Sequence, residues 1–194
     1  MNKTVFESFD GFTKAYPIII VFSSFINSIF NSTNEGYIFM VLLLVSNFLN
    51  HFLKIFIFKP IMGNKKFPIL GLGRRPDNAK NCKLFHTNEI AKSYGMPSGH
   101  SQISALFSTY LILKIINNKD LHMLYKIVSS LSLIILAVMV MYSRVYWSKC
   151  HTIQQVIVGG LIGTLLGYLI YKYKEYIFEY DWCYHILGNK KKNN

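Results

Sequence analysis

The chain alternates between long apolar blocks and shorter polar segments. A helix needs about 20 mostly apolar residues to cross a bilayer, and five blocks come close to that length. They comprise residues 15–31, 37–58, 98–116, 125–146 and 152–171. The pattern therefore predicts an all-α fold, a multi-pass membrane helix bundle of about five transmembrane helices.

The first and last blocks carry residues that refine this prediction. Pro17 stands near the start of the first block, where a proline fits the first turn of a helix because its missing N–H needs no partner. Glu7 and Asp10 precede this block, and no small-residue cleavage site is visible, so we expect a retained span. The last block carries four glycines, at 159, 160, 163 and 167, which predict a face for close helix packing.

Two segments do not read as spans. Residues 59–96 form a long polar stretch rich in lysine and arginine. Residues 172–194 form a basic aromatic tail, and its three acidic residues favour a position at the membrane surface over a crossing. No repeat or linker interrupts the chain, so we expect a single membrane domain over residues 1–194.

Counting crossings brings distant polar residues to one side. If all five blocks cross, the second and fourth end on the face where the third and fifth begin. The polar stretch 59–96, the segment Ser98–His100, Arg144 and His151 then share that face. Ionisable residues at the membrane are costly and usually functional, so the topology predicts one site there.

Composition supports a membrane protein. Hydrophobic residues make up 52% of the chain and charged residues 15%, against about 25% charged in soluble domains. The net charge of +12 does not point to nucleic acid, because no nucleic-acid motif is present; basic residues beside spans more often meet lipid head groups or a phosphate. Cys82, Cys150 and Cys183 match no metal spacing. The first two are expected on one face, which leaves a disulfide open.

The segment Pro97-Ser98-Gly99-His100 reads as the start of a helix. Free N–H groups and the helix dipole at such a start bind phosphate. An ordinary capped helix start with an incidental histidine is the alternative that the segment alone leaves open.

Arg144 and His151 lie seven residues apart. On a continuous helix this spacing places both on one face, and Gln155 lies within reach of the His151 imidazole. The alternative is an interfacial arginine that extends to the head groups beside a buried histidine.

Together these residues resemble the PAP2 phosphatase superfamily, the membrane relatives of vanadium haloperoxidases. Its motifs are Lys-x6-Arg-Pro, Pro-Ser-Gly-His and Ser-Arg-x5-His-x3-Asp. The chain has Arg75-Pro76 for the end of the first, residues 97–100 for the second, and Ser143-Arg144 with His151 for the third. The strings at 94–102 and 142–156 are similar to the dolichyl-diphosphatase branch, and the resemblance covers roughly residues 50–165.

The resemblance implies a metal-independent lipid phosphatase. His151 would attack phosphorus and form a phosphohistidine, and His100 would protonate the leaving oxygen and then activate water. Phosphate oxygens would be bound by Lys54, Arg75, Arg144 and the N–H groups at Ser98 and Gly99. No cofactor and no metal is implied.

Three departures from the family pattern affect these roles. No lysine precedes Arg75 with six residues between the two, as the first motif requires, so we assign that role to Lys54, with Lys59 and Lys66 as rivals. One extra residue separates Arg144 from His151, which requires a bulge or a shifted helix start. Gln155 replaces the family's aspartate; a glutamine can orient His151 but cannot balance its positive form with a full charge.

The expected substrate is a polyprenyl diphosphate or a related lipid phosphate held in the membrane. Three alternatives stay open: a phosphatase for phosphatidic acid or another lipid phosphate, a lipid phosphotransferase, and an inactive lipid-binding protein of the same fold. The sequence does not fix the oligomeric state.

The end of the chain bears on location. Lys190-Lys191-Lys192 resembles a dilysine retrieval signal of the endoplasmic reticulum. With five spans and a cytosolic tail, the site would face the lumen. A plain basic tail on the cytoplasmic side is the alternative.

Overall fold

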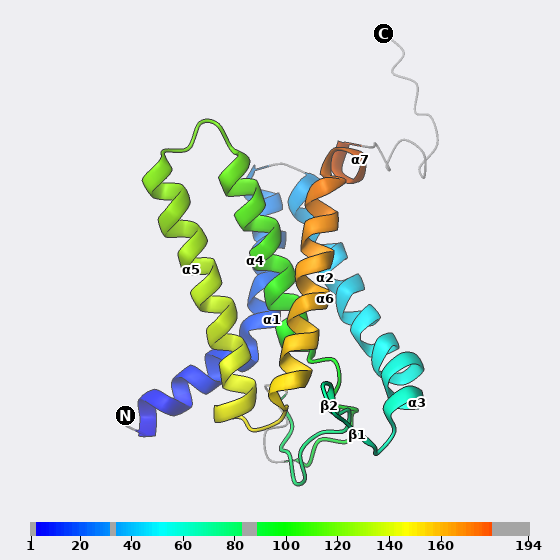
Figure 1. The fold of residues 1–194 in the computed structure, drawn as a ribbon. Coiled ribbons are helices and arrows are strands. Elements are labelled where there is room, and N and C mark those ends of the chain that lie inside the picture. Colours follow the sequence, from blue (N-terminus) through cyan, green and yellow to red (C-terminus); the bar gives the residue numbers. More distant parts are fainter. Residues whose placement is uncertain (1–2, 32–33, 83–88, 180–194) are drawn as a thin grey trace.

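The protein is a bundle of long helices, seen in a computed structural model that describes residues 3–31, 34–82 and 89–179. The long helices are α1 (Lys3–Asn31), α2 (Asn34–Phe52), α4 (Gly99–Asn117), α5 (Met123–Tyr142) and α6 (Ile153–Lys172). Figure 1 shows α4 in the middle of the bundle, between α5 and α6. The all-α prediction is confirmed.

Shorter elements extend or connect these helices. Two π-helical turns, η1 (Leu53–Phe58) and η2 (Ser143–Trp147), follow α2 and α5, and α3 (Lys59–Met62) continues from η1. The antiparallel strands β1 (Lys66–Phe67) and β2 (Gly71–Leu72) lie in the polar stretch, with Lys66 opposite Leu72 and Phe67 opposite Gly71. Beyond α6, α7 (Lys174–Glu179) begins the aromatic tail, whose lysines at 190–192 lie outside the described residues.

Four helical stretches in the described residues are long and apolar enough to cross a membrane. They are Glu7–Phe30, Asn34–Met62, Met123–Trp147 and Ile153–Lys172, and they make this an integral membrane protein. Four of the five predicted spans overlap these stretches.

The remaining predicted span, α4, has the same length as α2 but is not among these four. Its environment explains the difference. Ser101, Gln102 and Ser104 are buried, and α4 packs between its neighbours (Figure 1). A helix enclosed by other helices needs less apolar surface than one that faces lipid.

The predicted position of Pro17 is wrong. α1 begins at Lys3, well before residue 15, so Pro17 lies in the helix interior. An interior proline removes a backbone hydrogen bond and kinks the helix, and α1 is bent in Figure 1. The residues before Pro17 are nevertheless helical. They lie at the end of the bundle where the polar segments gather.

The glycines of α6 form a close-packing face, as the sequence predicts, and the helix that packs against it is α4. A Cβ atom at Gly159, Gly163 or Gly167 would overlap a backbone carbonyl oxygen of α4 or of the residue that caps it. Glycines at four-residue intervals lie on one face of a helix, so the two backbones meet along several turns. This contact places the start of α6 beside the start of α4.

A disulfide joins Cys82 to Cys150 with a Cα–Cα distance of 6.1 Å, within the usual range. The sequence left this pairing open. The bond connects the polar stretch to the residue just before His151.

The glycine contact generates a stability prediction. Gly163→Ala should lower the free energy of unfolding by about 1–3 kcal/mol, because the added methyl group overfills a close backbone contact. Gly11→Ala is the matched control, since nothing lies within 4 Å of a Cβ there, and it should be neutral or stabilising. Thermal unfolding in detergent measures both. Equal melting temperatures for the two variants would contradict the close-packing account.

Candidate functional site

The predicted site residues gather from four parts of the chain at one end of the bundle. One part is η1, which supplies Lys54; the other three are the polar stretch after α3, the start of α4, and the segment from η2 to the first turn of α6. The beginning of helix α1 also lies at this end, although the sequence predicted no role for its residues.

His151 is held by Gln155. The His151 side chain is buried, and its Nδ1 lies 2.8 Å from Gln155 Oε1. Gln155 Nε2 donates to the carbonyl oxygens of Leu72, at 2.9 Å, and Arg74, at 2.7 Å. Carbonyl oxygens only accept, so the amide nitrogen must face them and the amide oxygen must face His151. Nδ1 of His151 therefore carries a proton.

Arg75 gives a second constraint on the same imidazole. Its Nη1 lies 3.3 Å from His151 Nε2 and donates to the Cys150 carbonyl at 2.8 Å, while Nε and Nη2 donate to Ser93. A guanidinium only donates, so Nε2 must offer its lone pair. Both contacts indicate a neutral His151 whose Nε2 carries a lone pair that faces Arg75.

The surroundings favour this neutral form. Burial lowers the pKa of His151 well below its ordinary 6.5, and the positive charges of Arg75 and Lys54 lower it further. Burial also lowers the pKa of Arg75 to about 10, which leaves its guanidinium charged at neutral pH. A neutral imidazole thus faces a cation.

Arg144 is completely buried, which excludes the alternative of an arginine that extends to the lipid head groups. Its Nε donates to Ser143 Oγ at 3.0 Å and its Nη2 to Thr13 Oγ1 at 2.6 Å. Among the described residues, Nη1 has no hydrogen-bond partner. Buried donors are rarely left unpaired, so Nη1 is suited to an anion.

The extra residue between Arg144 and His151 is absorbed by η2. Ser148 N–H donates to the Ser143 carbonyl at 2.8 Å, the i to i+5 bond of a π-helical turn. This is the bulge that the sequence required. The helix then ends, and the N–H groups of Cys150 and His151 both donate to the Arg144 carbonyl, at 3.0 and 3.2 Å. Arg144 and His151 do not lie on one continuous helix, in agreement with the predicted end of one span at residue 146 and start of the next at residue 152. A folded-back chain brings the two residues together, so the shared helix face considered from their spacing does not apply.

At the start of α4, Ser98 caps the helix by accepting from Ser101. The Ser98 N–H donates to the Gln155 carbonyl at 3.0 Å, so it is occupied, contrary to expectation. His100 Nε2 lies 3.3 Å from the Lys14 carbonyl. Gly99 faces Asn50, with an added Cβ 3.1 Å from Asn50 Oδ1.

Asn50 belongs to a buried network that the sequence did not reveal. Its amide donates to Gln102 Oε1 at 2.8 Å, and Gln102 in turn donates to Ser46. These bonds join α2 to the start of α4. A polar residue inside an apolar block is the only sequence signal for such a network.

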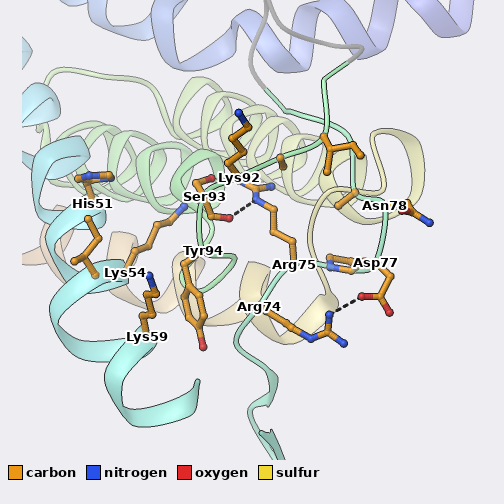
Figure 2. Close-up of a pocket in the computed structure, with 15 residues that line it drawn as sticks. His51, Lys54, Lys59, Arg74, Arg75, Asp77, Asn78, Lys92, Ser93 and Tyr94 are labelled. Atoms are coloured by element: carbon orange, nitrogen blue, oxygen red, sulfur yellow. Dashed lines mark hydrogen bonds and ion pairs between the residues drawn. The ribbon is translucent and has the colours of Figure 1, made fainter. Parts of the chain in front are cut away.

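A pocket of about 430 Å³ opens beside the site. Its lining includes Lys54, Lys59, Arg74, Arg75 and Lys92, and its one carboxylate, Asp77, pairs with Arg74 at 2.5 Å. Figure 2 shows Lys54 extending toward Ser93 and Arg75.

The pocket separates the three lysines considered for the first motif. Lys54 is buried and lines the pocket, Lys59 also lines it, and Lys66 does not. His100, Arg144 and His151 are not among the lining residues. Arg75 lines the pocket and also contacts His151, so it lies between the pocket and His151.

One group in the described part of the chain has ligand atoms close enough to hold a metal ion. Cys82, Cys150 and His151 place these atoms within 4.8 Å of one another. The two sulfur atoms are bonded to each other, so neither is the thiolate that binds metal. His151 Nδ1 is occupied by Gln155. In this state the group is not a metal site.

Comparison with known proteins places these observations in a family. The model of the PAP2 superfamily matches residues 35–179. Over 88 residues the chain is 42% identical to dolichyldiphosphatase of Saccharomyces cerevisiae, a match that covers 45% of this chain and 36% of that protein. Dolichyldiphosphatase 1 of Homo sapiens is 40% identical over 93 residues, which cover 44% of this chain and 38% of the human protein.

A longer match has lower identity. Lipid phosphate phosphatase gamma of Arabidopsis thaliana is 30% identical over 156 residues, which cover 78% of this chain and 59% of that protein. No solved structure matches the chain. Because the family model covers well over half of its length, the chain belongs to the PAP2 superfamily.

Proposed function

We propose that this protein is a lipid phosphatase that hydrolyses a polyprenyl, dolichyl-type diphosphate or a related lipid phosphate through a phosphohistidine. The observation that carries the proposal is the neutral His151, whose Nε2 lone pair faces Arg75 while Gln155 fixes its other nitrogen. The names of the similar proteins support the same substrate class. Matches to the dolichyldiphosphatases span less than two fifths of those proteins.

In the first step, His151 Nε2 attacks phosphorus and the bond from phosphorus to the leaving oxygen breaks. With a diphosphate, attack on the terminal phosphorus releases the lipid monophosphate. Arg75 and Nη1 of Arg144 bind the equatorial oxygens, and Lys54 adds charge. Phosphoryl transfer depends mainly on such positioning and charge stabilisation.

His100 is assigned the proton transfers. The carbonyl of Lys14 can only accept, so its 3.3 Å contact with His100 Nε2 requires a proton on that nitrogen. With Nε2–H held by this carbonyl, His100 protonated on both nitrogens would give its Nδ1 proton to the leaving oxygen. It would then accept one from water, which attacks the phosphohistidine, breaks the bond between nitrogen and phosphorus and releases inorganic phosphate.

No metal is needed in this scheme, because side-chain cations take the role of neutralising phosphate. The basic pocket beside Arg75 fits the head group, and the apolar outer faces of the bundle fit the lipid tail. Its several cations favour a diphosphate over a monophosphate.

The proposal includes a location in the endoplasmic reticulum with the site facing the lumen. A disulfide between Cys82 and Cys150 on the face of the site supports an oxidising compartment.

Histidine substitutions test the mechanism directly. In EDTA, wild-type protein should release phosphate from dolichyl or farnesyl diphosphate and be inhibited by vanadate. His151→Ala should reduce release to background, and His100→Ala should reduce it by about 10²- to 10⁴-fold. His122→Ala, at the start of α5, is the control and should keep wild-type activity. Unchanged release in both site variants, or a requirement for Mg²⁺, would contradict the mechanism; release only from phosphatidic acid would change the substrate.

Gln155→Glu tests whether the carboxamide is required. A carboxylate cannot donate to the carbonyls of Leu72 and Arg74, and a lost buried hydrogen bond costs roughly 1–3 kcal/mol. We expect kcat/KM to fall by about tenfold to a hundredfold. Gln154→Glu, an exposed neighbour, is the matched control. Full activity in Gln155→Glu would show that the family's usual carboxylate suffices here.

The lowered pKa of His151 predicts the pH dependence of kcat/KM. The nucleophile must be neutral, so the acid limb should lie below pH 6.5, the ordinary pKa of histidine. Arg75→Gln removes a positive neighbour that lowers this pKa, so the limb should move to higher pH. A wild-type limb at or above pH 6.5 would contradict a buried, neutral nucleophile.

A further inference from the structure

Helix α1 contributes to the site although it lies outside the family match, which begins at residue 35. Two of its residues contact residues assigned to catalysis. Thr13 Oγ1 accepts from Arg144 Nη2, and the Lys14 carbonyl lies against His100. Nothing in the three family motifs accounts for these contacts.

The hydroxyl of Thr13 has a fixed direction. Thr13 is completely buried, and its Oγ1 donates its one proton to the Asp10 carbonyl at 3.0 Å. A lone pair is thereby left to face Arg144 Nη2, at 2.6 Å. Together with the bond from Nε to Ser143, this contact fixes the plane of the guanidinium.

The carboxylate of Asp10 supplies charge to the same group. Oδ1 lies 4.0 Å from Arg144 Nη2, and it also accepts from Ser148 Oγ at 2.6 Å. Oδ2 pairs with Lys14 at 2.5 Å. Ser148 belongs to the folded-back connection that leads to His151, so Asp10 ties α1 to that connection.

These contacts leave one end of Arg144 available. A buried cation is costly unless it is paired and hydrogen-bonded. Thr13 supplies a hydrogen-bond acceptor and Asp10 a negative charge, and both face Nη2 of Arg144. Nη1 is left without a partner among the described residues. The side chain is therefore oriented and still able to bind one more acceptor.

We propose that Thr13 and Asp10 are positioning residues, which act through Arg144 to present its Nη1 to the transferred phosphoryl group. The inference rests on the proposed function. Helix α1 is then part of the catalytic unit and does more than anchor the chain in the membrane.

Vanadate inhibition separates positioning from a purely structural role. Vanadate can adopt the five-coordinate geometry of the transferred phosphoryl group, so its inhibition constant reports how well the site binds that geometry. A variant that merely unfolds in part loses active molecules, but the remaining ones bind vanadate as the wild type does.

The experiment compares Thr13→Val, Thr13→Ser and Asp10→Asn in the full chain. We measure kcat, KM, the vanadate inhibition constant and the melting temperature. Thr13→Val keeps the shape but removes the acceptor, and Asp10→Asn removes the charge. In both, kcat should fall by about tenfold to a hundredfold, the loss expected when a catalytic group is displaced by about 1 Å. The vanadate constant should rise in proportion, with a smaller change in KM.

Two variants serve as matched controls. Thr13→Ser keeps both hydrogen bonds and should restore most of kcat and of the affinity for vanadate. Glu7→Gln removes the same charge as Asp10→Asn from an exposed position of α1, and it should behave as the wild type.

Three results would overturn the inference. Wild-type kcat and vanadate affinity in both Thr13→Val and Asp10→Asn would exclude positioning. Lower activity with unchanged vanadate affinity and a lower melting temperature would assign the contacts to stability alone. Either result, with an active wild-type protein, leaves the proposed function unaffected. The third result is a wild-type protein that releases no phosphate, which would overturn the inference and the proposed function together.

Discussion

The carboxamide of Gln155 is the interaction on which the site depends. Its oxygen accepts from His151 Nδ1, and its nitrogen donates to the carbonyls of Leu72 and Arg74. The backbone carbonyl of the same residue accepts from Ser98 N–H. One residue thus fixes the tautomer of His151, the path of the chain before Arg75 and the start of α4. A carboxylate could satisfy the imidazole but not the two carbonyls, which gives a physical reason for an amide at this position.

Much of the architecture follows from the sequence because its signals are strong. Long apolar blocks identified four candidate membrane helices, and the glycines of α6 indicated a face for close helix packing. Counting crossings brought His100, Arg144 and His151 to one end of the bundle before any geometry was known. The assignment of chemistry to these residues, by contrast, rests on motif resemblance and remains a proposal.

The features that the sequence did not predict are set by tertiary contacts. The part of α1 that precedes Pro17 is not marked by a continuous apolar run in the sequence. Its residues are mostly polar and find their partners in and beside η2. The fold between Arg144 and His151 depends on backbone bonds to the Arg144 carbonyl, which no spacing rule reveals. The proposed role of Asp10 follows only from its distance to Arg144 and Ser148.

The polar character of α4 has a consequence for how the protein enters the membrane. Insertion of a helix by itself depends on its apolarity, and α4 is not among the stretches that meet that criterion. Its position in the membrane therefore depends on neighbouring helices such as α6, whose glycines pack against the α4 backbone. Since α6 follows α4 in the chain, His100 reaches its place only after the later helices have been synthesised. Assembly of the helix bundle and formation of the candidate site are then one event.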